Sequence, residues 1–185
     1  RVLHSGEDFK DSVKVTPETL AKIESNIDLG PLHMPANIMG IKACMEVMPS
    51  APQVAVFDTT FHSTMPQYAY MYAIPYEDYK QFKVRKYGFH GTSHKFVAKR
   101  GAELCGLDLE NSKIVTCHVG NGGSVTAVLN GKSYCTSMGF SPVDGLMMGT
   151  RCGDVDPSAV LYIAEKEGMN FAEINAMINK KSGVE

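Results

Sequence analysis

This sequence of 185 residues lacks the features that mark several common classes of protein. No apolar run approaches the roughly 18 residues of a membrane-spanning helix, and no charged-then-apolar leader pattern is present, so membrane insertion and export are not predicted. Neither charge dominates, because 18 Lys and Arg face 20 Asp and Glu, and the polybasic stretch typical of nucleic-acid binding is missing. The five cysteines are odd in number, scattered and without a CxxC pair, which is typical of reduced thiols in a cytoplasmic protein.

Familiar nucleotide and metal motifs are also missing. A Gly-Lys-Ser tripeptide begins at Gly131, but Thr126 stands where a P-loop requires its first glycine. Val125 likewise occupies the third glycine position of a G-x-G-x-x-G fingerprint. His90 and His94 have the spacing of a zinc pair, but the glutamate of an H-E-x-x-H motif is absent. The sequence therefore does not predict a bound metal held by its own side chains.

The most informative stretch that is present covers residues 86–94, with the letters Lys-Tyr-Gly-Phe-His-Gly-Thr-Ser-His. Gly88 and Gly91 allow the backbone to adopt positive φ and to approach a ligand closely. The Thr92-Ser93 pair predicts the cap of a helix that runs to about residue 104. His90 would then lie beside the electropositive start of a helix, where it could donate to phosphate oxygens. The alternative is an ordinary glycine-rich turn with surface histidines.

Two strand patterns carry further candidates. Residues 53–57 predict a short buried strand, and Asp58 follows it, where open α/β sheets place ligand chemistry; the alternative is a turn or capping aspartate. Residues 113–137 predict antiparallel strands, with Asn130-Gly131 as a type I′ turn. The turn at 118–122, His-Val-Gly-Asn-Gly, offers backbone N–H groups that suit phosphate oxygens, although a plain glycine hairpin is an equal alternative.

Helical patterns account for much of the remaining chain. Thr16 and Pro17 predict a helix start, and a second helix over about 36–47 carries a core stripe of Ile38, Ile41, Met45 and Met48. Gly106 predicts the end of the helix that follows residue 92. Two more helices are expected at about 158–166 and 172–180, the latter opened by a capping box. The segment 63–79 is rich in Tyr, Met and Pro and is expected to pack over a core or an interface.

Residues 88–94, together with the Phe-Asp-Thr-Thr-Phe-His stretch at 57–62, resemble the signature of the acetate kinase family. Residues 1–7 resemble a family segment, with Leu3 in place of a valine and Ser5 in place of a glycine. Residues 118–122 match another family motif, with Val119 in place of leucine, and 149–157 match a Gly-Thr-Arg-x-Gly-Asp-x-Asp-Pro stretch. Propionate kinases share these motifs. The resemblance implies an α/β, ribonuclease-H-like or actin-like two-domain kinase fold with a mixed sheet flanked by helices, divided into residues 1–60 and 61–185.

The resemblance also implies roles for individual residues. The expected catalytic residues are Asp58, His90 and Arg151. For Arg151, the alternative is a structural pairing with Asp154 or Asp156, two residues whose spacing fits a helix start better than a metal site. The expected carboxylate-substrate residues are Arg1, Leu3, Leu32, His33, Phe89 and Pro142, and the expected ATP-binding residues are His118, Val119, Gly120, Asn121 and Gly122. Mg²⁺ accompanies ATP, and its protein ligand is expected outside this chain.

The implied reaction is reversible phosphoryl transfer from ATP to acetate, giving acetyl phosphate and ADP. Leu3 is one methylene larger than the usual valine, which favours acetate over propionate. A cytoplasmic homodimer is expected. Family members are about twice this length and the chain begins without Met, so an internal fragment, inactive by itself, is expected. The alternatives are a kinase for propionate or another short carboxylate, and a non-catalytic nucleotide-binding protein of the same superfold.

Overall fold

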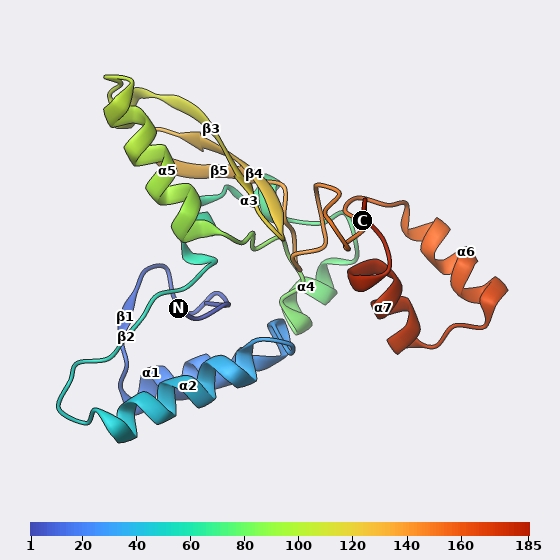
Figure 1. Ribbon diagram of the computed structural model, residues 1–185, viewed down its shortest axis with the longest axis horizontal. Coiled ribbons are helices and arrows are strands. Elements are labelled where there is room, and N and C mark those ends of the chain that lie inside the picture. Colours follow the sequence, from blue (N-terminus) through green and yellow to red (C-terminus); the bar gives the residue numbers. More distant parts are fainter.

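The computed structural model describes residues 1–185 (Figure 1), and its first part is a helical layer on a small β-ladder. β1 (Val13–Lys14) pairs antiparallel with β2 (Val54–Ala55), and between them lie α1 (Pro17–Ser25), η1 (Ile27–Leu29) and α2 (Met34–Val47). Thr16 caps α1, as predicted, and its Oγ1 accepts from Thr19 N at 3.2 Å. α2 begins two residues earlier than predicted because a proline in the first turn removes no helical hydrogen bond.

The predicted strand at 53–57 is shorter than expected. Only β2 pairs with β1, whereas Phe57 forms a parallel bridge with Val2. Around this bridge the apolar side chains of the first part form one core, and burying a side chain of this kind stabilises the fold by roughly 1.5–3 kcal/mol. The buried members of this core are Val2, Phe9, Val15, Ile23, Met34, Ile38, Ala55 and Phe57.

The expected apolar stripe on α2 is mostly confirmed. Ile38 is buried, and Ile41 and Met45 pack against the core. Met48 is 46% exposed, so its assignment to the core was wrong. The reason is that α2 ends at Val47 and the backbone at Met48 leaves the helical direction, with φ −128° and ψ 62°.

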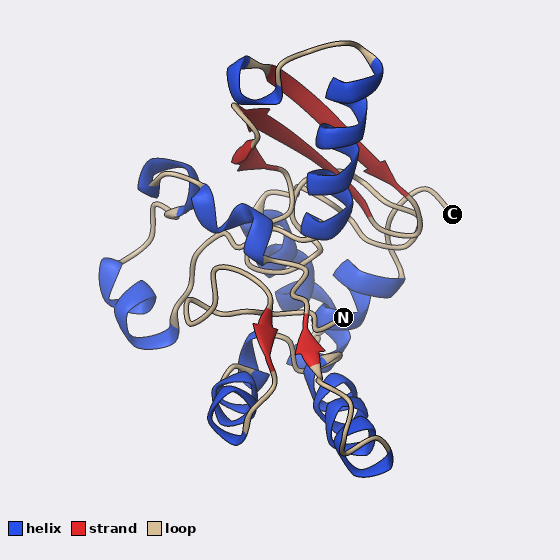
Figure 2. Ribbon diagram, turned by 90° about the vertical axis from the view of Figure 1, so that its left-hand side faces the viewer, coloured by secondary structure: helices blue, strands red, loops and turns tan.

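The second part is built on a three-stranded antiparallel sheet in the order β3-β4-β5, formed by β3 (Lys113–Val119), β4 (Gly123–Leu129) and β5 (Lys132–Thr136). Asn130 and Gly131 both have positive φ, 50° and 75°, which confirms the predicted type I′ turn. α5 (Gly91–Leu104) runs along this sheet and contacts β3, and the β1–β2 pair lies well apart from it (Figure 2).

Short helices connect the two parts: η2 (Thr60–Thr64), α3 (Gln67–Tyr70) and α4 (Tyr76–Phe82), with η3 (Leu109–Asn111) following α5. The sequence did not predict the short helices α3 and α4, because Pro66 and Pro75 interrupt any longer helical pattern. This segment packs only in part, since Tyr68 is 74% exposed while its hydroxyl meets Tyr134 Oη at 2.8 Å. Gly106 follows the end of α5 with φ 64°, as predicted.

A long loop leads from β5 to α6 (Pro157–Glu167) and α7 (Phe171–Lys180). Asp156 caps α6 by accepting from Ser158 N, and Asn170 with Glu173 forms the predicted capping box of α7. No helix is long and apolar enough to cross a membrane. The mixed α/β character predicted from the sequence is confirmed.

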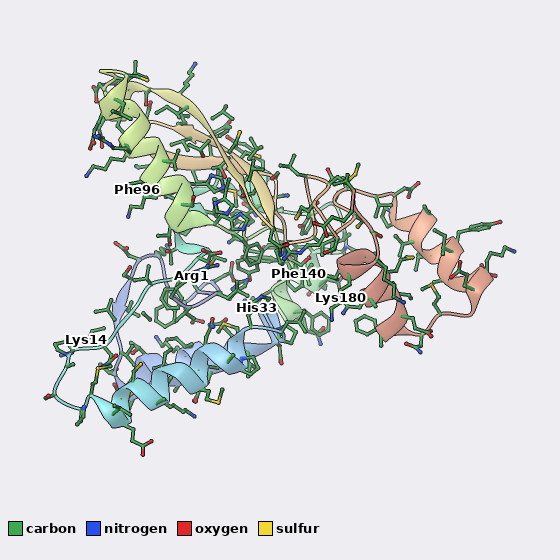
Figure 3. All side chains as sticks on the ribbon, in the orientation of Figure 1. Arg1, Lys14, His33, Phe96, Phe140 and Lys180 are labelled. Atoms are coloured by element: carbon green, nitrogen blue, oxygen red, sulfur yellow. The ribbon has the colours of Figure 1, made fainter.

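The two parts meet at Leu3, which packs against the first core and also against a smaller cluster of Phe89, Met138 and Met148. Arg1 and Phe140 lie near the middle of the molecule, whereas Lys14 and Phe96 lie on its outer parts (Figure 3). Residues from distant stretches of the chain therefore converge at this junction.

Candidate active site

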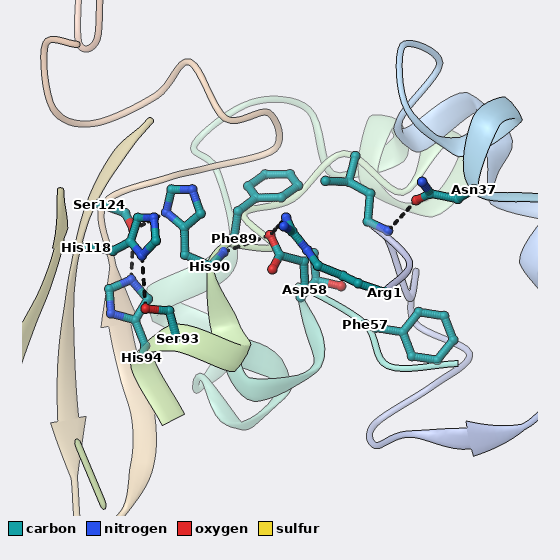
Figure 4. A network of polar contacts seen from close by, with 12 residues as sticks. Arg1, Asn37, Phe57, Asp58, Phe89, His90, Ser93, His94, His118 and Ser124 are labelled. Atoms are coloured by element: carbon teal, nitrogen blue, oxygen red, sulfur yellow. Dashed lines mark hydrogen bonds and ion pairs between the residues drawn. The ribbon is translucent and has the colours of Figure 1, made fainter. Parts of the chain in front are cut away.

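Asp58 lies at the centre of the junction. The Val2–Phe57 bridge places it there, because Asp58 N donates to Val2 O at 3.0 Å. Its side chain is only 4% exposed, and Oδ2 accepts from Arg1 Nη2 and from His90 N, both at 2.9 Å (Figure 4). A buried carboxylate requires such charge-assisted partners. Asp58 thus joins the first residue of the chain to the start of α5.

The loop that ends at His90 is held tightly against Asp58. Gly91 N donates to Asp58 O at 2.8 Å, and a Cβ on Gly91 would lie 2.5 Å from that same oxygen, so only glycine fits. His90 itself has φ 58° and is the N-cap residue of α5. The predicted Thr92-Ser93 cap was wrong, because both residues lie inside the first turn and Ser93 Oγ instead meets His118 Nδ1 at 2.9 Å.

His90 belongs to a cluster of imidazoles above the sheet. Its ring stacks on His118, with centroids 3.9 Å apart and planes inclined by 26°. Its Nδ1 lies 2.7 Å from Ser124 Oγ, which is also 2.7 Å from His94 Nε2 (Figure 4). Burial lowers the pKa of His90 to about 4; the nearby His118 adds to this effect and Asp58 opposes it. In the free protein this ring is neutral at pH 7.

The glycine turn and Arg151 face the same histidine. A Cβ built on Gly122 would lie 3.1 Å from Arg151 Nη1 and 3.4 Å from His90 Nε2. Arg151 Nη1 donates to Pro142 O at 3.1 Å and to neither of the two aspartates weighed as its partners. Those carboxylates are used elsewhere: Asp154 accepts from Gly145 N, and Asp156 caps α6. Arg151 is therefore held by a backbone carbonyl, and its Nη1 and His90 Nε2 both lie close to Gly122.

The residues expected around the carboxylate substrate divide into two groups. Leu3 packs against the cluster that contains Phe89, and Leu3 N donates to Asn37 Oδ1 at 2.8 Å. Pro142 is joined to the centre through Arg151. By contrast, Leu32 is 71% exposed, and His33 is exposed at the start of α2. The geometry thus brings three of the apolar residues to the junction and leaves this pair open to solvent.

Two residues that organise the site, Ser124 and Asn37, are not predicted from the sequence. On β4 the inward positions are Ser124, Thr126 and Val128, all buried. Hydroxyl groups at alternate, inward positions of a strand indicate a buried hydrogen-bonding partner, here an imidazole, and the sequence contains this signal. Asn37 gave no such signal, because its partner is a backbone N–H from a remote segment.

Other regions of the structure hold no comparable group of predicted site residues. No group of three or more His, Cys, Asp or Glu side chains is arranged to hold a metal ion. A cavity of about 660 Å³ lies between the 141–157 loop and helices α6 and α7, but none of the predicted site residues line it. Glycine backbone, two arginines, a histidine and one buried carboxylate instead converge at the junction. A combination of this kind is suited to binding phosphoryl groups and carboxylates.

Comparisons with known proteins identify the family of the chain. The model of the acetokinase family matches residues 1–185, and the chain belongs to that family. It is 60% identical over 184 residues to an acetate kinase of Caldanaerobacter subterraneus subsp. tengcongensis and 59% identical to one of Thermotoga maritima. Each match covers all of this chain and 46% of the relative, so the chain spans about half the length of these curated relatives.

Solved structures show the same likeness. The crystal structure of Porphyromonas gingivalis acetate kinase matches with a TM-score of 0.95 and 51% identity, over 99% of this chain and 46% of that one. A propionate kinase from Francisella tularensis subsp. tularensis matches with a TM-score of 0.94 and 50% identity, over 99% and 47%. The chain therefore has the actin-like α/β fold of acetate and propionate kinases, as predicted.

Proposed function

We propose that the protein containing this chain is an acetate kinase, which reversibly transfers a phosphoryl group from ATP to acetate to give acetyl phosphate and ADP. The observation that carries the proposal is the convergence of Arg151 and His90 on one point beside Gly122. Phosphoryl transfer needs in-line positioning and neutralisation of charge on the equatorial oxygens, and little covalent help from the protein. A guanidinium and an imidazole directed at one point are suited to that task.

Each predicted site residue has a place in this proposal. Arg1 holds the substrate carboxylate, for which a planar guanidinium is suited. Asp58 positions Arg1 and the His90 backbone; it does not act as a base, since acetate is already ionised at pH 7. Residues 118–122 bind the nucleotide phosphates through backbone N–H groups. Leu3, Phe89 and Pro142 line the alkyl pocket, and Leu32 and His33 complete it.

Magnesium is proposed to accompany ATP and to neutralise phosphate charge. Asp58 is the one carboxylate among the converging side chains, and its Oδ2 already accepts from Arg1 and from His90 N. The converging residues therefore do not form a magnesium site of their own, and we propose that its ligand lies in another part of the protein. A cytoplasmic homodimer with a domain boundary near residue 60 completes the proposal. Because the chain spans 46% of its relatives, residues 1–185 alone are expected to be inactive.

Propionate is the second candidate acceptor, because a propionate kinase matches this structure nearly as well as an acetate kinase does. The side chain of Leu3 favours acetate. A pocket misfit of one methylene corresponds to about 1–3 kcal/mol in kcat/KM, which is large enough to separate the two acceptors in a direct comparison.

The role of Arg151 is tested by Arg151→Ala in the complete gene product. Loss of a transition-state contact is expected to lower kcat by roughly 10²–10³-fold, while the Kd for ATP changes by less than about threefold. Both quantities are measured on the same preparation, kcat by coupled assay and Kd by calorimetry. Equal losses in kcat and ATP affinity would refute the assignment, because they would indicate a contact made equally in the ground state.

A further inference from the structure

The hydroxyl of Ser124 couples the protons of two histidines. It is fully buried and lies 2.7 Å from both His90 Nδ1 and His94 Nε2 (Figure 4). A hydroxyl has one hydrogen and two lone pairs, and these two nitrogens are the only hydrogen-bond partners of Ser124 Oγ. Its buried hydrogen is therefore satisfied only when it donates to one imidazole and accepts from the other. The position of the hydrogen on His90 is therefore fixed by the position of the hydrogen on His94.

The hydrogen bonds of Thr116, beyond His94, determine which atom donates and which accepts along this series. His94 Nδ1 lies 2.8 Å from Thr116 Oγ1, and Thr116 Oγ1 donates to the backbone carbonyl of Thr126 at 3.4 Å. A carbonyl only accepts, so with the Thr116 hydrogen on that carbonyl, His94 Nδ1 donates to Thr116 Oγ1. His94 Nε2 then accepts from Ser124, and Ser124 accepts from His90 Nδ1–H. The reverse direction would leave the carbonyl of Thr126 without this hydrogen bond.

The surroundings of His90 Nε2, the ring nitrogen that does not contact Ser124, independently favour the same placement of hydrogens. Its Nε2 and Arg151 Nη1 flank the point where a Cβ of Gly122 would lie, at 3.4 Å and 3.1 Å. A nitrogen lone pair is attracted to a guanidinium, whereas an N–H is repelled by it. Arg1 and the stacked His118 also oppose positive charge on the ring, and only Asp58 favours it.

We propose that Ser124, His94 and Thr116 are positioning residues that keep the His90 hydrogen on Nδ1 and leave Nε2 bare, so that His90 binds a phosphoryl group only after taking up a proton. The proton comes from solvent and adds to Nε2, and the resulting imidazolium donates to a phosphoryl oxygen while Nδ1–H stays on Ser124. The series of hydrogen bonds ends on the backbone carbonyl of Thr126, which carries no hydrogen, so the proton cannot pass further. The part about the phosphoryl group rests on the proposed function.

The test uses the complete gene product labelled with ¹⁵N-histidine. Long-range ¹H–¹⁵N spectra at pH 7 are expected to show His90 with protonated Nδ1 and bare Nε2, and both nitrogens protonated with saturating acetyl phosphate and no nucleotide. Calorimetry in two buffers is expected to show uptake of about one proton on binding. A protonated Nε2 in the free protein, or a bare Nε2 in the complex, would overturn the proposal. If acetyl phosphate does not bind, the proposed function fails, and the free-state spectrum still decides the tautomer.

A matched pair of variants tests the series of hydrogen bonds from His90 through Ser124 and His94 to Thr116. Thr116→Val removes the terminal hydroxyl at nearly constant shape, and a population of His90 with a protonated Nε2 is expected in the free protein. Thr126→Val is the control, since Thr126 faces Thr116 across the sheet and its hydroxyl bonds to Thr136 Oγ1 at 2.8 Å, outside this series. The control is expected to keep the wild-type tautomer. No change in either variant, or equal change in both, would contradict the positioning role of Thr116.

Discussion

Gly122→Ala offers a direct probe of the point where Arg151 and His90 meet. Its φ lies outside the left-handed region, so the backbone accepts alanine, and the added methyl would lie 3.1 Å from Arg151 Nη1 and 3.4 Å from His90 Nε2. The mobile end of Arg151 must shift by a few tenths of an ångström. We expect the free energy of unfolding to stay within about 0.5 kcal/mol of wild type. The methyl would also occupy the point proposed for the phosphoryl group, and displacing a reacting group by about 1 Å can cost about 100-fold, which corresponds to about 2.7 kcal/mol in the barrier.

The assay measures kcat and KM for ATP and acetate in the complete gene product, with the unfolding free energy from urea titration. Gly120→Ala is the matched comparison, because its methyl would meet Gly122 O at 3.7 Å and His118 Nε2 at 3.8 Å, which are ordinary contacts. A smaller loss, mainly in KM for ATP, is expected there. If Gly122→Ala keeps wild-type kcat while remaining folded, the phosphoryl group does not occupy this point and the reasoning is wrong.

Two further predictions concern stability. Gly88→Ala is expected to destabilise the fold by about 3 kcal/mol in urea titration, since residue 88 has φ 73° and a methyl there would overlap Thr136 Cγ2. A loss below about 1 kcal/mol would contradict so close an approach of the two segments. Burial lowers the pKa of His62 to about 4, against the opposing effects of its hydrogen bond to Phe89 O at 2.8 Å and of Asp58, so the unfolded chain binds more protons between about pH 4 and 6.5. Stability should therefore fall as pH is lowered through that window, by about 1–3 kcal/mol for His62, and His62→Gln should flatten the slope; an unchanged slope would refute this assignment.

Local signals predicted the local structure well. The type I′ turn at Asn130-Gly131, the Thr16 cap and the capping box of α7 all formed as expected, because each depends on residues a few positions apart. Failures came where a distant partner decided the outcome. Phe57 pairs with Val2 rather than with β1, so the predicted strand is cut short.

At the candidate site, individual residues were foreseen but their arrangement was not. Helix-cap chemistry predicted a cap at Thr92-Ser93, whereas contact with Asp58 holds His90 in the left-handed region and makes it the cap residue. The approach of Arg151 to Gly122 joins residues from separate loops, and no spacing in the sequence encodes it. Residue propensities and hydrophobic periodicity describe local structure and do not predict tertiary contacts of this kind.

The most direct test of the proposed activity is the steady-state kcat/KM of the complete gene product with ATP-Mg²⁺ and acetate, propionate or butyrate as acceptor. We expect phosphoryl transfer with acetate as the best acceptor, because Leu3, which packs against the cluster that contains Phe89, is proposed to narrow the alkyl pocket. A preference for propionate would keep the chemistry and refute the role of Leu3. No transfer to any of the three, with ATP still bound, would contradict the central claim and indicate a non-catalytic nucleotide-binding protein.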